Sequence, residues 1–206
     1  MGPHIAVARV ATLHADPRQR ETRPQIDCDA AEHAVADLLV ALGRDRDDDD
    51  LRETPRRVAA AYAELLTHEP VSLTTFPNDA GYDELVVVRE IPFHSLCMHH
   101  LLAFHGVAHV AYLPGERIIG LSKLARIVEL FARDLQLQER LTMQIATCLE
   151  EELAPKGVGV VIEAEHMCMS LRGVQKAGTK TTTSALLGLL RDDSRTRAEF
   201  LSLVKR

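Results

Sequence analysis

The sequence predicts an α+β protein, in which a four-stranded antiparallel sheet is backed by two helices and preceded by a helical extension. Three observations support this class. Strand-like runs occur in two pairs, and the first pair is rich in Val and bounded by Pro and Gly, as expected of strands. Two stretches between these pairs carry apolar residues at the i, i+3, i+4 and i+7 spacing of helices. The resulting order is strand, strand, helix, helix, strand, strand.

The chain divides into three predicted parts. Residues 1–25 show no sustained period and are rich in Arg, Pro and Thr, which indicates a flexible arm. Residues 26–70 are expected to form the helical extension, and residues 71–206 the α+β domain. A length of 206 residues suits one large domain with such an extension.

Two helices are expected in the extension. Apolar residues at helical spacing begin near Asp29 and stop at Gly43. A second helix is expected from Thr54, which can cap it, with Pro55 in its first turn. The acidic run between them, residues 44–50, is typical of a solvated connection, because it lacks the glycine and glutamate of a calcium loop.

The strands and helices of the α+β domain are predicted from the local sequence pattern. The first pair of strands is predicted at 84–93 and 105–113, the two helices at 122–135 and 138–153, and the second pair of strands at 157–166 and 179–190. Residues 184–190 taken alone are also compatible with a helix. A last short helix begins near Ser194. Such a small open sheet has two exposed edges, which favours oligomer formation.

Composition excludes several classes of partner. The formal net charge of -6 argues against general affinity for nucleic acid or acidic membranes. A polyanionic ligand would therefore need a local basic pocket. No run of 18 apolar residues is present, so no transmembrane helix is expected. The first residues lack the features of a secretory signal, and a cytoplasmic location is expected.

Four cysteines are present, at positions 28, 97, 148 and 168. In a cytoplasmic protein their thiols should stay reduced, so metal binding or burial is favoured over disulfides. Cys148 lies in a helical run and is interpreted as a small buried hydrophobe. Cys28 stands in a polar stretch without a partner motif and is assigned no role.

A candidate metal site is formed by two short motifs. The first contains Cys97 and His100 as a Cys-x-x-His pair, and the second contains Cys168. Two thiolates and one imidazole leave the fourth tetrahedral position of a metal open, which is the catalytic pattern rather than the structural one. The alternative is that the pair arises by chance, as such pairs often do.

Four further histidines lie near these motifs. His99 and His166 would stand beside the metal, free to move protons. His166 and Cys168 are predicted to share one face of a strand, because alternate residues of a strand point the same way. His105 and His109 are interpreted as strand residues with local hydrogen bonds.

Several long motifs resemble the GTP cyclohydrolase I family, in the same order along the chain. They are SLCMHHL from Ser95, IGLSKLARIVELFARDLQLQERLT from Ile119, VVIEAEHMCMSLRGVQK from Val160 and TRAEFLSLV from Thr196. The upstream TPRRVAAAY also resembles the TPxRV helix of the family. The resemblance runs from about Leu51 to the C-terminus and does not include the first fifty residues.

The resemblance implies the tunnelling fold for residues 71–206, in which the sheets of several subunits join into a barrel. It implies a homo-oligomer, usually a decamer of two stacked pentamers. One Zn2+ per subunit would be held by Cys97, His100 and Cys168, with His99 and His166 as the acid–base residues. Neither a nucleic acid nor a membrane is expected as a binding partner.

The resemblance also implies GTP as the substrate. Gln138 and Glu139 would recognise the guanine edge, although Glu139 alone also fits a helix N-terminal charge. The residues implied for the triphosphate are Lys123, Arg126, Arg172 and, from an adjacent subunit, Arg57. Ser122 would act on the ribose or a phosphate. Taken alone, each of these cations would be interpreted as a solvated surface charge.

The implied reaction is hydrolysis of GTP at C8, release of formate and rearrangement to 7,8-dihydroneopterin triphosphate. One position departs from the family pattern, because Met98 stands where a Glu is usual. Two alternatives stay open: another purine- or pterin-handling enzyme of the tunnelling fold, and a catalytically altered or silent GTP-binding oligomer.

Overall fold

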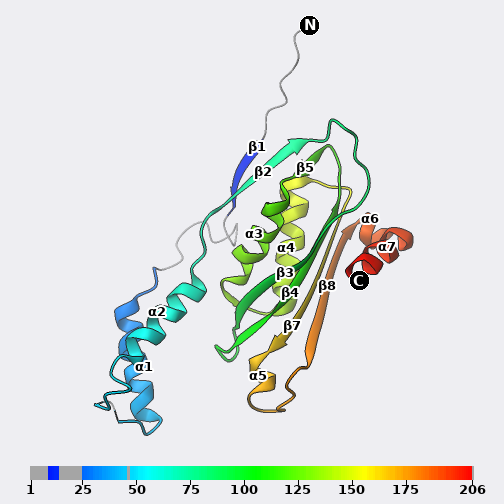
Figure 1. Ribbon diagram of the computed structural model, residues 1–206. Coiled ribbons are helices and arrows are strands. Elements are labelled where there is room, and N and C mark those ends of the chain that lie inside the picture. The colour runs from blue at the N-terminus through cyan, green and yellow to red at the C-terminus, as the bar shows by residue number, and fades with distance from the viewer. Residues whose placement is uncertain (1–8, 14–24, 46, 206) are drawn as a thin grey trace. The chain divides into compact units, whose positions relative to one another are not determined.

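The computed structural model describes residues 9–13, 25–45 and 47–205 (Figure 1). It divides into two compact units, one within Arg18–Thr67 and the other comprising Met1–Pro17 and His68–Arg206. Among the described residues, the helices are all too short or too polar to cross a membrane.

The first unit contains two helices, α1 (Cys28–Ala41) and α2 (Thr54–Leu66). The side chain of Asp27 caps α1 by accepting a hydrogen bond of 2.9 Å from the backbone N–H of Ala30. Thr54 was predicted to cap α2, but it is the first residue of the helix, and Glu53 occupies the cap position without a side-chain bond. Pro55 is tolerated in the first turn because no intrahelical N–H is needed there.

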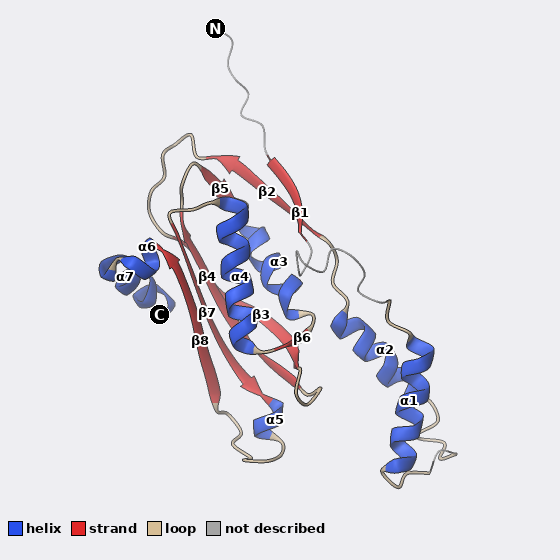
Figure 2. Cartoon of the chain, turned by 180° about the vertical axis from the view of Figure 1, so that it is seen from behind, coloured by secondary structure: helices blue, strands red, loops and turns tan. Residues whose placement is uncertain are grey.

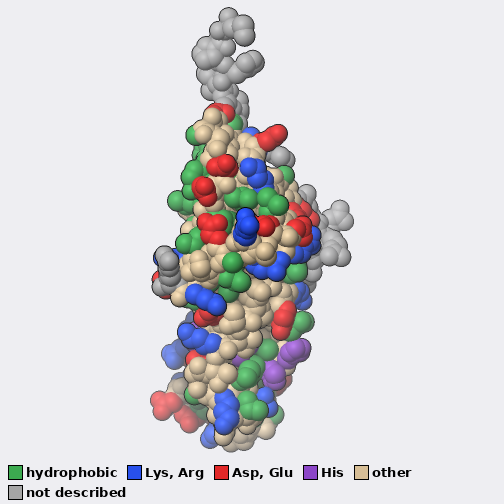
Figure 3. Space-filling model, turned by 90° about the vertical axis from the view of Figure 1, so that its right-hand side faces the viewer, with side chains coloured by type: hydrophobic (Ala, Val, Ile, Leu, Met, Phe, Trp, Pro, Cys, Tyr) green, Lys and Arg blue, Asp and Glu red, His purple; other side chains and the backbone are tan. Residues whose placement is uncertain are grey.

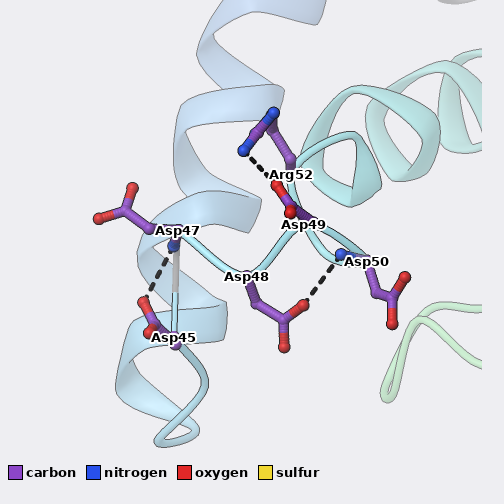
Figure 4. Close-up of polar contacts among 6 residues, drawn as sticks. All are labelled: Asp45, Asp47, Asp48, Asp49, Asp50 and Arg52. Atoms are coloured by element: carbon purple, nitrogen blue, oxygen red, sulfur yellow. Dashed lines mark hydrogen bonds and ion pairs between the residues drawn. The ribbon is translucent and has the colours of Figure 1, made fainter.

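The acidic connection between α1 and α2 forms turns stabilised by its own side chains (Figure 4). Asp45 accepts a hydrogen bond of 2.9 Å from the backbone N–H of Asp47, and Asp48 accepts one of 2.9 Å from Asp50. Asp49 pairs with Arg52. The described aspartates are exposed, as expected of a solvated connection.

The second unit is built on a five-stranded sheet in the order β6-β3-β4-β7-β8. The strands are β3 (Val86–Cys97), β4 (Ala103–Leu113), β6 (Leu135–Gln136), β7 (Gly157–His166) and β8 (Lys180–Gly188). Neighbours from β3 to β8 pair antiparallel, which confirms the predicted four-stranded sheet. The short β6 was not predicted, and it adds a parallel pairing at the end of β3.

The two faces of this sheet are covered differently (Figures 1 and 2). Helices α3 (Leu121–Ala132) and α4 (Gln138–Leu153) cover one face, as the sequence predicts, and form the main apolar core with it. On the opposite face α6 (Leu189–Asp192) and α7 (Ser194–Val204) bury Leu190 and Phe200 against alternate residues of β4 and β7.

A second, three-stranded sheet has the order β1-β2-β5, with β1 (Arg9–Leu13), β2 (Val71–Pro77) and β5 (Arg117–Ile119). A flexible arm is predicted over residues 1–25, and within that range residues 9–13 form β1, which five residue pairs join to β2. The rest of the predicted arm that precedes residue 25 lies outside the described residues.

One end of the large sheet gathers several chain segments. The strand β3 ends at Cys97 and β7 ends at His166, and α4 begins at Gln138 directly after β6. Gly106 permits a close approach of β4 and β7 near this end, since a Cβ atom there would lie 1.9 Å from the carbonyl oxygen of Glu163. The opposite end holds the start of α3, where the N–H of Gly120 donates to Thr74 of β2 at 3.2 Å.

Candidate active site

Three potential metal ligands meet at the end of the sheet. The Sγ atoms of Cys97 and Cys168 and a ring nitrogen of His100 lie within 4.8 Å of one another. Cys97 Sγ lies 3.5 Å from His100 Nδ1. A tetrahedral ion with bonds of about 2.0–2.3 Å keeps its donors roughly 3.5 Å apart, so this donor set fits a single zinc ion. Over the described residues, no other group of His, Cys, Asp and Glu meets this spacing.

A tight turn after β3 positions Cys97 and His100. The carbonyl oxygen of Cys97 accepts hydrogen bonds from the N–H groups of His100 at 3.2 Å and Leu101 at 2.9 Å. Leu101 has a φ of 56°, in the left-handed region, which reverses the chain into β4. The turn therefore brings the imidazole over the thiol that precedes it by three residues.

Cys168 reaches the group by a different route from the one predicted. The predicted placement of His166 and Cys168 on one strand face is wrong, because β7 ends at His166. Cys168 lies in the short helix α5 (Met167–Ser170), closed by a 3.0 Å hydrogen bond from Leu171 N–H to the carbonyl of Met167. A helical turn, and not strand alternation, orients this thiol.

The electrostatics of the group favour a bound cation. Burial raises the pKa of the Cys168 thiol, and the neighbouring Cys97 raises it further. Two thiolates side by side need positive charge, which a metal ion supplies. Arg172 contributes to this charge, with Nη1 at 3.5 Å from His100 Nε2.

The two remaining cysteines differ from the ligand pair. Burial in α4 raises the pKa of Cys148 to about 12, so its thiol is neutral and belongs to the core, and Cys28 is exposed on α1.

His166 is held on both sides. Its ring stacks on Phe104 of β4, with centroids 4.5 Å apart, and its Nε2 lies 2.8 Å from Oε1 of Gln138. Burial lowers the pKa of His166, and the nearby carboxylate of Glu139 partly offsets this effect. Glu139 is exposed in the first turn of α4, on the same side of the site.

His99 and Met98 lie in the turn between the ligands. The exposed His99 ring has its centroid 6.1 Å from that of His100. Met98 is 40% exposed, and its backbone N–H donates to the carbonyl of Gln136 at 3.1 Å. The side chain that departs from the family pattern is therefore at the surface of the site.

Other predicted residues are not brought together with the metal group. Ser122 and Lys123 lie in the first turn of α3, while the far end of that helix leads to β6 beside Cys97. A helix of 12 residues is about 18 Å long, so these residues lie well away from the ligands. Arg126 lines a cavity of about 270 Å³ between α3 and β3. Arg57 lies in α2, in the other unit.

Sequence reasoning missed a clamp on the segment after α5. Oε1 of Glu165 accepts hydrogen bonds from Ser170 Oγ at 2.6 Å and from the N–H of Gly178 at 2.8 Å. These bonds join the end of β7 to both ends of the loop that carries Arg172. No motif identifies such a clamp, because its partners are defined only by the course of the loop.

Charged side chains of both signs are interspersed over the face drawn in Figure 3. The fold and site together indicate the class of α+β enzymes in which two cysteines and one histidine that could hold a metal ion lie at the end of an antiparallel sheet, with further histidines beside them.

The chain matches the family model for GTP cyclohydrolase I over residues 31–205, and it belongs to that family. It is 52% identical to the GTP cyclohydrolase 1 of Mycobacterium tuberculosis over 197 residues, which cover 93% of this chain and 98% of the relative. The GTP cyclohydrolase 1 of Mycolicibacterium paratuberculosis is 53% identical over 187 residues, covering 88% and 92%. The predicted family and fold class are thereby confirmed.

Proposed function

We propose that the protein hydrolyses GTP at C8 of the purine, releases formate and forms 7,8-dihydroneopterin triphosphate. The observation that carries this proposal is the convergence of Cys97, His100 and Cys168 beside His166 and Glu139 in a member of this family. The three ligands would leave one coordination position of a metal open. His166 would carry protons, and the carboxylate of Glu139 would bind the guanine base.

One Zn2+ per subunit is the proposed metal, held by Cys97, His100 and Cys168. The donor set supports it, since two thiolates and one imidazole with an open fourth position are typical of catalytic zinc. Bound zinc lowers the pKa of a water molecule from about 15.7 to roughly 7, which supplies hydroxide at neutral pH. The proposed location is the cytoplasm, where the reducing environment keeps both cysteines available as thiolates.

Glu139 is the proposed reader of the guanine edge. Its carboxylate would accept from the ring N–H and the exocyclic amine, which adenine does not offer together. The residue Gln138 is 2% exposed and its side-chain amide is bonded inside the protein, so we propose that this residue contributes to guanine binding through its backbone. Its N–H group lies in the first turn of α4, where intrahelical acceptors are missing.

Two histidines would move protons. His166 would protonate N7 of the purine, which makes C8 more electrophilic toward water. His99 would assist opening of the ribose, and Ser122 the rearrangement of the sugar before it closes onto the base. The exposure of His99 beside the ligand His100 supports a role at the substrate rather than in the core.

The triphosphate would be bound by Lys123, Arg126, Arg172 and Arg57. Only Arg172 lies beside the metal group in the chain itself. We therefore propose that another copy of the chain supplies Ser122, Lys123 and Arg126, in a homo-oligomer that is a decamer. The open edge of β8, which within the described residues pairs only with β7, supports such assembly.

In this proposal residues 71–206 form the tunnelling-fold catalytic domain and residues 26–70 a helical extension. A second candidate, a silent GTP-binding oligomer of the same fold, is favoured by one observation only. Met98 removes the negative charge that the family usually places within the ligand motif.

One assay separates these functions. Purified, zinc-loaded protein is mixed with GTP, and formate release and pterin fluorescence are followed together. We expect both signals, and we expect a chelator to abolish both. GTP binding without formate would contradict the proposed reaction and support the silent oligomer. Formate without a pterin product would show that hydrolysis occurs but that the sugar rearrangement does not.

A further inference from the structure

We propose that Gln138 is a positioning residue that keeps His166 in the tautomer protonated at Nε2, so that Nδ1 is the atom through which His166 exchanges protons. The inference rests on the proposed function for its consequence in catalysis, but the tautomer itself can be observed without substrate. The starting observation is the 2.8 Å separation between His166 Nε2 and Gln138 Oε1.

The surroundings of Gln138 determine which end of its amide faces His166. Its Nε2 lies 3.1 Å from the carbonyl oxygen of Ile162 and 2.9 Å from that of Thr181. Carbonyl oxygens only accept hydrogen bonds. A rotated amide would place Oε1 against both carbonyls, where no proton is available. The nitrogen of Gln138 therefore points toward the strands, and its oxygen points toward His166.

The buried Thr142 and the half-buried Thr183 close the network around this amide. Thr142 Oγ1 donates to the backbone carbonyl of Gln138 at 2.7 Å, so its single proton is used. Thr183 Oγ1, 2.6 Å from Thr142 Oγ1, must then donate to it, which leaves Thr183 as an acceptor for Gln138 Nε2 at 3.1 Å. The amide nitrogen of Gln138 has two protons and three neighbouring acceptors, so each of its protons has an acceptor while its oxygen faces His166.

The ring of His166 is oriented as firmly as its partner. It lies parallel to the buried Phe104, with 3° between the planes. A ring turned over within this stack would present Cε1 to Gln138 Oε1 and leave a buried acceptor without a donor. Nε2 must therefore carry a proton. Within the described part of the chain, no hydrogen-bond partner is assigned to Nδ1.

The proton chemistry follows from this geometry. Neutral His166 holds its proton on Nε2 and offers the lone pair of Nδ1. A proton from solvent water binds Nδ1, and transfer of that proton to purine N7 forms the new N–H bond and returns the ring to the neutral state. Gln138 Oε1 accepts from Nε2–H throughout, so the ring does not turn between turnovers.

Solid-state NMR of zinc-loaded protein labelled with 15N-histidine tests the tautomer at about pH 8, where an unperturbed histidine is neutral. The His166 signals are identified by their loss in His166→Gln. We expect a protonated Nε2 and a bare Nδ1 in the wild-type protein. A protonated Nδ1 in that spectrum would overturn the proposal whatever the variants do.

The variant Gln138→Met keeps the side-chain volume and removes the acceptor. We expect mixed tautomers, unchanged zinc content and a turnover number about ten- to a hundredfold lower, with little change in KM for GTP. The matched control is Gln144→Met on the same helix, which loses a bond to Gln136 but should keep the tautomer and the turnover. An unchanged tautomer in folded, zinc-replete Gln138→Met would contradict a positioning role.

If Gln138→Met does not fold, Thr183→Val removes one acceptor of the amide and leaves the contact with His166 in place. We expect a partial loss of tautomer purity from that variant, and a spectrum identical to wild type would count against the network. Absence of GTP turnover in the wild-type protein would refute the proposed function alone, since the tautomer is measured without substrate.

Discussion

The ring of His166 lies parallel to the ring of Phe104, with centroids 4.5 Å apart and 3° between the planes. The two residues face each other across the β4–β7 pairing. Phe104 is fully buried and packs edge-on against Phe93 at 6.0 Å. A residue of the apolar core therefore determines the plane of the proposed proton carrier.

Replacing Phe104 with Ala should affect stability and activity together. The cavity left behind should lower the free energy of unfolding by about 3–5 kcal/mol. The unsupported ring of His166 should also lower formate release per folded molecule. Urea unfolding and single-turnover assays measure the two effects. Phe200→Ala is the control, because Phe200 is equally buried on the opposite face and should cost only stability. Equal loss of activity in both variants would disprove the specific role of Phe104.

Removing one thiolate should remove the metal. We expect Cys168→Ser to retain less than roughly a tenth of the bound zinc and of the formate release, because two ligands hold zinc poorly. Cys148→Ala should keep both, since the neutral Cys148 thiol lies in the core and outside the ligand group. Metal analysis of the dialysed proteins provides the measurement. Full zinc content in Cys168→Ser would exclude this ligand.

The negative charge of Glu139 should determine the preference of the protein for GTP over ATP. Glu139→Gln replaces a charged acceptor, whose hydrogen bonds contribute about 1.5–3 kcal/mol each, so kcat/KM for GTP should fall about 10- to 150-fold. Glu150→Gln, near the other end of the same helix, should leave kcat/KM unchanged. Steady-state kinetics with GTP and ATP give both values. A variant that still prefers GTP as strongly as wild type would rule out Glu139 as the guanine reader.

A mixed oligomer should recover activity that its components lack. Lys123→Ala and Cys168→Ser are each expected to be inactive alone, because one lacks the phosphate contact and the other the metal. Refolded together, they should form some sites with an intact Cys168 from one copy and an intact Lys123 from the next. Formate release from the mixture, compared with each variant refolded alone, measures this recovery. No gain on mixing would indicate that a single copy supplies both residues.

The clamp formed by Glu165 should weaken in acid. The hydroxyl of Ser170 lowers the pKa of Glu165 below its usual 4.5, and the N–H of Gly178 adds to this effect. A carboxylate with a lowered pKa stabilises the fold above its unfolded pKa, and the contribution is lost as the pH falls through the folded value. The Gly178 amide should therefore exchange with solvent faster below about pH 4, after correction for intrinsic exchange.

The matched comparison for this clamp uses Glu165→Ala and Glu163→Ala, two residues of the same strand. Glu165→Ala should exchange fast at Gly178 even at about pH 7, whereas Glu163→Ala should behave like wild type. Protection of Gly178 that persists in Glu165→Ala would show that other contacts hold the loop.

The local sequence pattern was sufficient to predict most helices and strands of the second unit. The helix predicted at 138–153 coincides with α4, and the strand predicted at 157–166 coincides with β7. Their apolar periodicity is a property of neighbouring residues, so it can be read along the chain. The strands β1 and β5 could not be predicted, because each is stabilised by pairing with β2, which is distant in sequence.

For the site, the sequence by itself identified the candidate residues, since the Cys-x-x-His spacing and the motif with Cys168 are local. The tertiary structure alone decided how they are oriented. Cys168 reaches the metal group through a helical turn after β7, and Gln138 faces His166 because carbonyls of β7 and β8 hold its amide. Hydrogen-bond direction depends on partners from several strands, and no pattern within one segment contains that information.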